Sequence, residues 1–70
     1  MLNGVPGMIG ETALVVKEID GEHRPGRIRA RGEDWIAIPL DPDETIPEGS
    51  TVVVADVQRG MLVVYGADAP

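Results

Sequence analysis

The sequence predicts an all-β fold, a small five-stranded antiparallel barrel that is closed or partly open. Short stretches rich in Val, Ile and Leu are separated by turn residues, and they fit buried strands better than helical stripes. Glycine allows the backbone to turn or bulge where strands bend to close a barrel. We therefore expect four glycines to determine the fold, namely Gly26, Gly32, Gly49 and Gly60.

Length and composition limit how such a domain can be stabilised. Its 70 residues form one domain, which buries only about 60% of the surface of the unfolded chain. The sequence has no cysteine, so neither a disulfide nor a thiolate metal site can hold the domain together. Closure of the sheet, or self-association with another chain, is the remaining route to stability.

The chain is acidic, with a formal net charge of -6. An acidic surface repels phosphate backbones and anionic lipid headgroups, which disfavours binding of nucleic acid or of a membrane surface. No apolar run approaches the ~20 residues that span a bilayer, and the N-terminus lacks the pattern of a signal peptide. We therefore expect no direct membrane insertion by this chain.

We expect five strands, each bounded by turn residues. Turns are indicated by Asp20-Gly21, by residues 32–34 and by Arg59-Gly60. Pro39 removes a backbone donor, so the third strand should lie at an edge or end there. The expected strands span residues 11–19, 27–31, 35–38, 50–58 and 61–65.

Two of these strands have informative side-chain patterns. The second strand alternates strictly, which directs Ile28 and Ala30 inward and its three arginines toward water. In the fourth strand, alternation would point the apolar Val57 outward, so we expect a bulge near residues 55–56. Ile46, the lone large apolar residue of an acidic connector, is expected to close one end of the barrel.

Groups that could support catalysis or bind a metal are isolated in the sequence. His23, the only histidine, lies in a polar loop, and Ser50, the only serine, lacks the surroundings of a nucleophile elbow. Asp41, Asp43 and Glu44 lack the glycine and the distal glutamate of an EF-hand loop. We therefore expect no catalytic residue, no metal and no cofactor. A hydrolytic or metal-dependent activity at His23 with the Asp41 loop is the weakest alternative.

The arginines are the most prominent cluster of like side chains. They either form a basic stripe for phosphates or pair with carboxylates on neighbouring strands. Barrels that bind single-stranded nucleic acid also stack bases on aromatic side chains, and this chain has one Trp, one Tyr and no Phe. We favour ion pairing, with single-stranded nucleic-acid binding as the alternative function and an acidic protein partner as a third option. The cluster consists of Arg24, Arg27, Arg29 and Arg31.

Trp35 either anchors the core or is exposed at an interface, because aromatic side chains dominate both small cores and binding hot spots. Few large side chains are available in this sequence, so we expect Trp35 in the core. It remains a candidate for partner contact together with Arg27, Arg29 and Arg31.

Several short segments occur in a recognisable combination. They are Gly7-x-x-Gly10, Pro25-Gly26-Arg27-Ile28, Gly32-Glu33-Asp34-Trp35-x-Ala37, and a valine-rich segment that runs from Ile46 through Gly49 and Gly60 to Val64. Together, over residues 7–65, they resemble the C-terminal soluble domain of NfeD-like proteins.

The resemblance implies an OB-like barrel over residues 7–66, between a flexible N-terminal segment or linker, residues 1–6, and a flexible tail, residues 67–70. It implies a non-catalytic interaction module of a prokaryotic membrane-associated protein, on the cytoplasmic side. The implied partners are stomatin-, prohibitin- or flotillin-like proteins, and the implied role is membrane-protein quality control. The barrel of this family has no catalytic residues, so its glycines and Trp35 transfer as fold determinants only.

Overall fold

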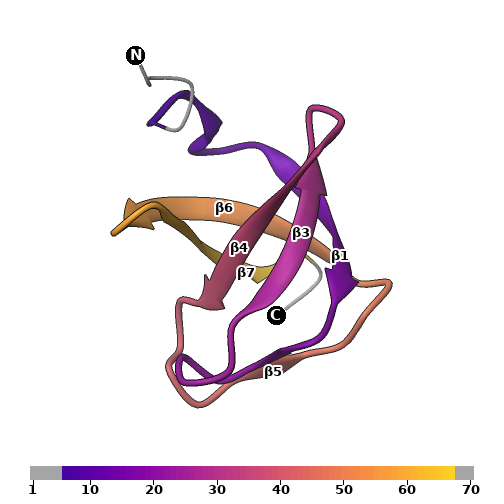
Figure 1. The fold of residues 1–70 in the computed structure, drawn as a ribbon, viewed down its shortest axis with the longest axis vertical. Coiled ribbons are helices and arrows are strands. Elements are labelled where there is room, and N and C mark those ends of the chain that lie inside the picture. The colour runs from indigo at the N-terminus through magenta and orange to yellow at the C-terminus, as the bar shows by residue number, and fades with distance from the viewer. Residues whose placement is uncertain (1–5, 68–70) are drawn as a thin grey trace.

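Residues 6–67 are described by the structure, a computed structural model in which five strands close a barrel (Figure 1). The predicted flexible segments, residues 1–6 and 67–70, lie almost wholly outside the described residues. In order around the barrel, the strands are β1 (Thr12–Lys17), β3 (Gly26–Ala30), β4 (Glu33–Pro39), β7 (Met61–Gly66) and β6 (Thr51–Gln58).

Two small elements accompany the barrel. A two-stranded sheet of β2 (Ile19–Asp20) and β5 (Thr45–Ile46) lies at the lower end of the barrel in Figure 1. Its strands pair antiparallel, with Ile19 opposite Ile46. At the other end, a short 3-10 turn, η1 (Pro6–Met8), precedes β1. This second sheet was not among the expected elements.

The prediction of an antiparallel barrel is wrong for one pair of strands. β4 and β7 run parallel, with Ala37 opposite Leu62, whereas the other four neighbouring pairs are antiparallel. The reason is geometric, because strands of alternating direction can close a ring only when their number is even. A closed ring of five strands therefore contains a parallel pair. The barrel strands, counted along the chain, follow the order 1-2-3-5-4, which is the expected OB-like topology.

Two strand boundaries differ from those expected. The strand expected over residues 11–19 is interrupted after Lys17, because the register of β1 against β3 shifts between Val15 and Lys17. The turn expected at residues 32–34 is made instead by Arg31 and Gly32, so Arg31 does not belong to β3. Two other expectations are confirmed, since β4 ends at Pro39 and the register of β6 against β7 shifts between Val54 and Asp56.

The core consists of aliphatic side chains from every strand of the barrel. Ile28 and Ala30 point inward from β3, as their alternation predicted, and Ile46 is buried from β5. No polar side chain of residues 6–67 is buried. Trp35 and Val57 are partly buried and pack against this core. Its members are Met8, Ala13, Val15, Ile19, Ile28, Ala30, Ala37, Ile46, Val52, Val54, Leu62 and Val64.

Both two-residue hairpin turns of the barrel have positive φ at both positions. Arg59 (φ 53) and Gly60 (φ 78) join β6 to β7, and Arg31 (φ 55) and Gly32 (φ 76) join β3 to β4. Such turns match the twist of the flanking strands and favour Asn or Gly at their first position. A long side chain with positive φ costs about 1 kcal/mol. Both turns therefore place an arginine where the backbone disfavours it.

Replacing Arg59 with Asn is expected to raise the free energy of unfolding by about 0.5 kcal/mol or more, because Asn adopts positive φ with less strain. Urea unfolding measures the change. The control is Gly60→Ala in the same turn, which is expected to lower the free energy of unfolding. A less stable Arg59→Asn domain would contradict this explanation of the turn.

Candidate interaction surface

The outer surface of β3 carries the arginines that the sequence singled out. Arg27 and Arg29 alternate with buried residues and point to solvent, as predicted. Arg31 is exposed as well, but it projects from the turn that follows the strand. The three side chains therefore do not form one continuous stripe along a strand, and each has different neighbours.

Arg29 pairs with Asp34, which lies opposite it on β4. The Nε atom of Arg29 donates a hydrogen bond to Oδ1 of Asp34 over 2.8 Å. This bond lowers the pKa of the Asp34 carboxyl from its ordinary value of 3.8, and the positive charges of Arg29 and Arg27 add to the effect. The same bond raises the pKa of Arg29. The pair is exposed, so it fixes two side chains on the surface without adding much stability.

A change of Asp34 to Asn should alter how stability depends on pH. In the unfolded chain, the Asp34 carboxyl binds a proton at a higher pH than in the folded domain. Its contribution to stability is therefore present above pH 3.8 and is lost as the pH falls through the lower pKa of the folded state. We expect Asp34→Asn to be less stable than the parent at pH 7, with a difference that narrows below about pH 4.

Urea unfolding across this pH range tests the expectation. Glu33→Gln is the control, because Glu33 is the exposed neighbouring carboxylate and has no ion pair within the described part of the chain. A difference that stays constant from pH 7 to pH 3 would argue against a role for the Asp34 charge.

Arg31 is also held by a carboxylate. Its Nε and Nη2 atoms both donate to Oε2 of Glu11, and Nη2 further donates to the carbonyl oxygen of Gly7 over 3.2 Å. Glu11 lies 20 residues earlier in the chain, just before β1. These contacts connect the β3–β4 turn to the N-terminal turn. Ion pairing, the favoured interpretation of the arginines, thus holds for Arg29 and Arg31.

Arg27 has a different environment. It lies directly opposite Lys17 of β1, and both side chains are exposed. Within residues 6–67, no carboxylate oxygen lies within 4.0 Å of either cation. Like charges at directly opposite positions of a sheet are destabilising. The fold therefore places two cations opposite each other in a chain that has 12 acidic residues. The nearby Asp34 carboxylate, whose pKa the charge of Arg27 helps to lower, is already bonded to Arg29.

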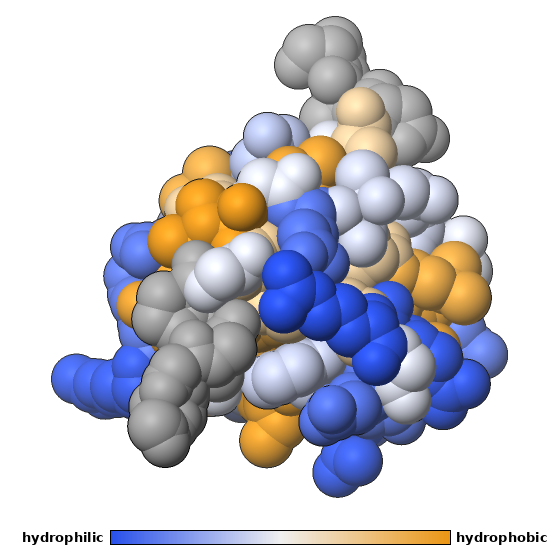
Figure 2. All heavy atoms as spheres, turned by 90° about the horizontal axis from the view of Figure 1, so that it is seen from above, coloured by the Kyte–Doolittle hydropathy of each residue, from blue (hydrophilic) through white to orange (hydrophobic). Residues whose placement is uncertain are grey.

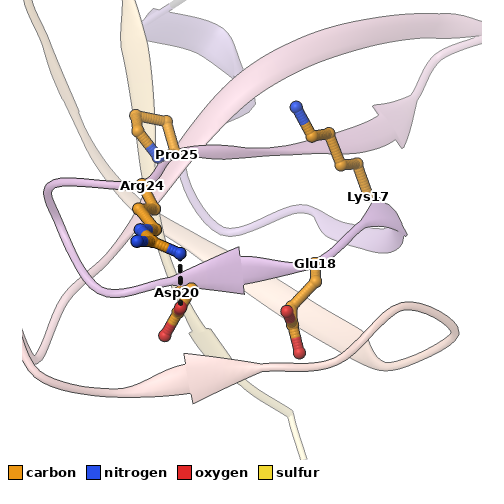
Figure 3. A pocket seen from close by; sticks show the side chains of 5 residues that line it. All are labelled: Lys17, Glu18, Asp20, Arg24 and Pro25. Atoms are coloured by element: carbon orange, nitrogen blue, oxygen red, sulfur yellow. Dashed lines mark ion pairs between the residues drawn. The ribbon is translucent and has the colours of Figure 1, made fainter.

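Nearby carboxylates do not compensate Lys17. Lys17, Glu18, Asp20 and Arg24 line a shallow depression with Pro25. Figure 3 shows the ammonium group of Lys17 pointing away from the carboxylates of Glu18 and Asp20. Asp20 instead pairs with Arg24, at 3.9 Å between Nη1 and Oδ2. The positive charge of Lys17 thus remains available to a molecule outside the domain.

Aliphatic side chains flank these charges. Leu14 on β1 lies opposite Arg29, and Ile36 on β4 lies opposite Arg27. Leu14 is 46% exposed and Ile36 is 48% exposed. We call this surface the β1/β3/β4 face. In Figure 1, β3 and β4 lie toward the viewer and β1 lies on the right. The side chains of this face are Leu14, Lys17, Arg27, Arg29, Asp34 and Ile36.

Apolar groups also occur elsewhere on the surface. Seen from above, the molecule shows hydrophobic side chains in separate groups, with hydrophilic side chains between them (Figure 2). Ile9, Leu40 and Tyr65 are the remaining large hydrophobic residues that are exposed within the described part of the chain. Apolar side chains scattered in this way are ordinary on protein surfaces.

Trp35 is turned toward the barrel. It is partly buried against the core, and its indole Nε1 donates a hydrogen bond to the carbonyl oxygen of Ala30 over 3.1 Å. The expectation that Trp35 anchors the core therefore fits its position. None of the six side chains that define the β1/β3/β4 face is therefore aromatic.

The isolated polar groups are not brought together. The imidazole of His23 is 91% exposed and lies 3.6 Å from the carboxylate of its neighbour Glu22. Oδ1 of Asp41 accepts a hydrogen bond from the backbone N–H of Asp43, so it stabilises a turn. Among residues 6–67, no group of His, Asp and Glu side chains is arranged to hold a metal ion. The backbone carbonyl oxygen of Ser50 accepts a hydrogen bond from the N–H of Val15 on β1.

Sequence reasoning missed Leu14, Lys17 and Ile36 as members of this surface. In the sequence, Leu14 belongs to a mainly apolar strand and Ile36 to a short apolar one, so neither residue is marked as exposed. Alternation over Thr12 to Val15, with Ala13 and Val15 inside, is the signal that could have placed Leu14 outside. The pairing of Lys17 with Arg27 depends on the bulge in β1, and no local pattern reveals it.

Comparisons with known proteins agree with this geometry. The sequence model of a family described as "NfeD-like C-terminal, partner-binding domain" matches residues 5–65. A crystal structure from Corynebacterium glutamicum is similar, with 30% identity, a TM-score of 0.79, and coverage of 86% of this chain and 92% of that one. It is the soluble domain of a membrane protein implicated in regulation of membrane protease activity.

A second similar structure is the C-terminal domain of the stomatin operon partner protein 1510-C from Pyrococcus horikoshii. It has 31% identity and a TM-score of 0.77, and the match covers 90% of this chain and 92% of that chain. Among curated proteins, none matches this sequence significantly. Within residues 6–67, the structure has no helix with the length and apolar character needed to cross a membrane.

Proposed function

Because the chain belongs to the family of NfeD-like C-terminal, partner-binding domains, we propose that it is a non-catalytic module that docks a stomatin-like protein. The family description supplies the general role, which is partner binding. The class of partner is supported by the Pyrococcus relative, a stomatin operon partner protein with the same barrel. Prohibitin- and flotillin-like proteins belong to the same proposed class of partners.

The state of the arginines is the observation that favours a protein partner over single-stranded nucleic acid. Arg29 and Arg31 are already held by carboxylates of the domain itself. Barrels that bind single strands instead combine a cationic groove with exposed aromatic platforms. Here the side chains beside the arginines are the aliphatic Leu14 and Ile36, and the indole of Trp35 packs against the core. Such a surface suits contacts with protein side chains.

Attachment to a membrane belongs to the same proposal. The Corynebacterium relative is the soluble domain of a membrane protein implicated in regulation of membrane protease activity. By analogy, the domain is tethered to a prokaryotic membrane through its parent protein and lies on the cytoplasmic side. There it assembles with its partner in membrane-protein quality control.

A direct binding measurement tests the proposed function. The domain is immobilised and exposed to a purified stomatin-like protein from the same organism, at concentrations up to about 50 µM. We expect saturable binding with a Kd in the micromolar range, equivalent to about -8 kcal/mol. A single-stranded oligonucleotide is measured in parallel at low salt. Absence of binding to the protein, or tighter binding to the oligonucleotide, would contradict the proposal.

A further inference from the structure

The opposed cations of β1 and β3 have no carboxylate within 4.0 Å among residues 6–67. Lys17 of β1 and Arg27 of the neighbouring strand β3 lie directly opposite each other, at positions where like charges destabilise a sheet. Local arrangements that violate the rules of folding without compensation are expected at functional sites. A molecule that brings negative charge to this position would remove the repulsion when it binds.

The neighbours of the two cations describe the rest of such a molecule. Ile36 of β4 lies opposite Arg27. Leu14 of β1 lies opposite Arg29, which is the next outward-facing residue of β3. Both aliphatic side chains are about half exposed, and contact with them requires apolar groups. Arg29 is paired with Asp34, so the free positive charge is concentrated at Lys17 and Arg27. The pattern is thus two cations next to two aliphatic side chains.

We propose that the β1/β3/β4 face binds a segment of a partner protein that carries carboxylates next to aliphatic side chains. The proposal rests on the proposed function in that the ligand is a protein. Charge complementarity identifies this occupant, because its carboxylates would pair with the cations of Lys17 and Arg27. A phosphate backbone would offer no aliphatic groups to Leu14 and Ile36. The net charge of -6 slows the approach of an acidic partner, but at physiological salt charges more than about 8 Å apart are largely screened.

The first test uses two short fluorescent peptides. One has leucines at helical spacing with glutamates between them, and in the other every glutamate is replaced by glutamine. Fluorescence anisotropy measures the binding of each to the folded domain. We expect the glutamate peptide to bind about tenfold more tightly, and its affinity to fall with salt. Equal binding of the two peptides, or binding of neither, would overturn the proposal.

Charge-reversal variants locate the site. Lys17→Glu and Arg27→Glu are each expected to weaken binding of the glutamate peptide about tenfold. Arg59→Glu is the matched control, because it makes the same change of charge at the β6–β7 turn, on the left in Figure 1 and away from β1 and β3. An equal loss of affinity in the control would overturn the assignment to this face.

Stability separates a binding role from a structural one. Lys17→Glu places an acidic side chain opposite Arg27, so its unfolding midpoint should rise by roughly 2 to 4 °C while its binding of the glutamate peptide weakens. A variant that lost both stability and binding would indicate that Lys17 supports the fold, and would contradict the proposal.

Other occupants give distinct outcomes. Tighter binding of a single-stranded oligonucleotide than of the glutamate peptide, lost in Arg27→Glu, would overturn the proposal in favour of a nucleic acid. Dimers of the parent domain that dissociate in Lys17→Glu would overturn it in favour of a second copy. If the glutamate peptide binds this face and the stomatin-like protein does not bind the domain, the partner class fails while the surface assignment holds.

Discussion

Replacing Gly26 with Ala is expected to lower the free energy of unfolding by about 3 kcal/mol or more. A methyl group at this position would lie 2.3 Å from the carbonyl oxygen of Lys17 and 2.4 Å from that of Glu18. Both are backbone atoms at the point where β1 gives way to β2, so no side-chain rotation can relieve the contact. β3 would have to move away from β1, and the barrel would open at that seam.

Such a loss is large for this domain, because the total stability of 70 residues is on the order of 4 to 10 kcal/mol. Urea unfolding measures it, and Gly7→Ala provides the control. Within the described part of the chain, no heavy atom other than those of its chain neighbours lies within 4 Å of a methyl group at Gly7, so that variant should differ from the parent by less than about 0.5 kcal/mol. If Gly26→Ala retained the stability of the parent, the close approach of β3 to the end of β1 would be refuted.

The second large effect is expected at Met8. Its side chain is fully buried in the core although it precedes the first barrel strand. The N–H of Gly10 donates to the carbonyl oxygen of Val54 over 2.8 Å, which holds this segment against β6. Met8→Ala would leave a cavity at the upper end of the barrel and is expected to cost about 2 to 5 kcal/mol.

The neighbouring residue provides the matched control. Ile9 is 52% exposed, so Ile9→Ala removes a side chain of similar size with little loss of buried area. We expect less than about 1 kcal/mol for this change. Equal effects of the two substitutions in urea unfolding would show that η1 does not contribute to the core.

Local patterns predicted most of the barrel. Alternation placed Ile28 and Ala30 inside, and the apolar Val57 at an outward position revealed the bulge near Asp56. These features depend on neighbours one or two residues apart, where side-chain direction is fixed by the strand itself. The five strands were predicted, but local patterns left open whether the barrel is closed or partly open. The parallel pair follows only once the ring of five strands is closed, so it was missed.

Features that join distant segments could not be predicted. β2 and β5 have two residues each, too few for any periodicity to appear. Met8 lies in a short turn without a repeating pattern, and Glu11 reaches Arg31 only because the barrel brings the two together. The candidate surface has the same origin, since Lys17 meets Arg27 only through the pairing of β1 with β3. The excess of carboxylates predicted that the arginines form ion pairs. Which carboxylate pairs with Arg29 and which with Arg31 depends on the fold.

Mapping of the contact surface tests the central claim most directly. The domain is labelled with ¹⁵N and titrated with the stomatin-like protein, and the backbone amide signals are followed by NMR. We expect shifts or broadening to concentrate on β1, β3 and β4 and to spare the β6–β7 turn. Changes centred on the β2–β5 sheet, or no change at saturating partner, would contradict the claim that this outer face of the barrel binds the partner.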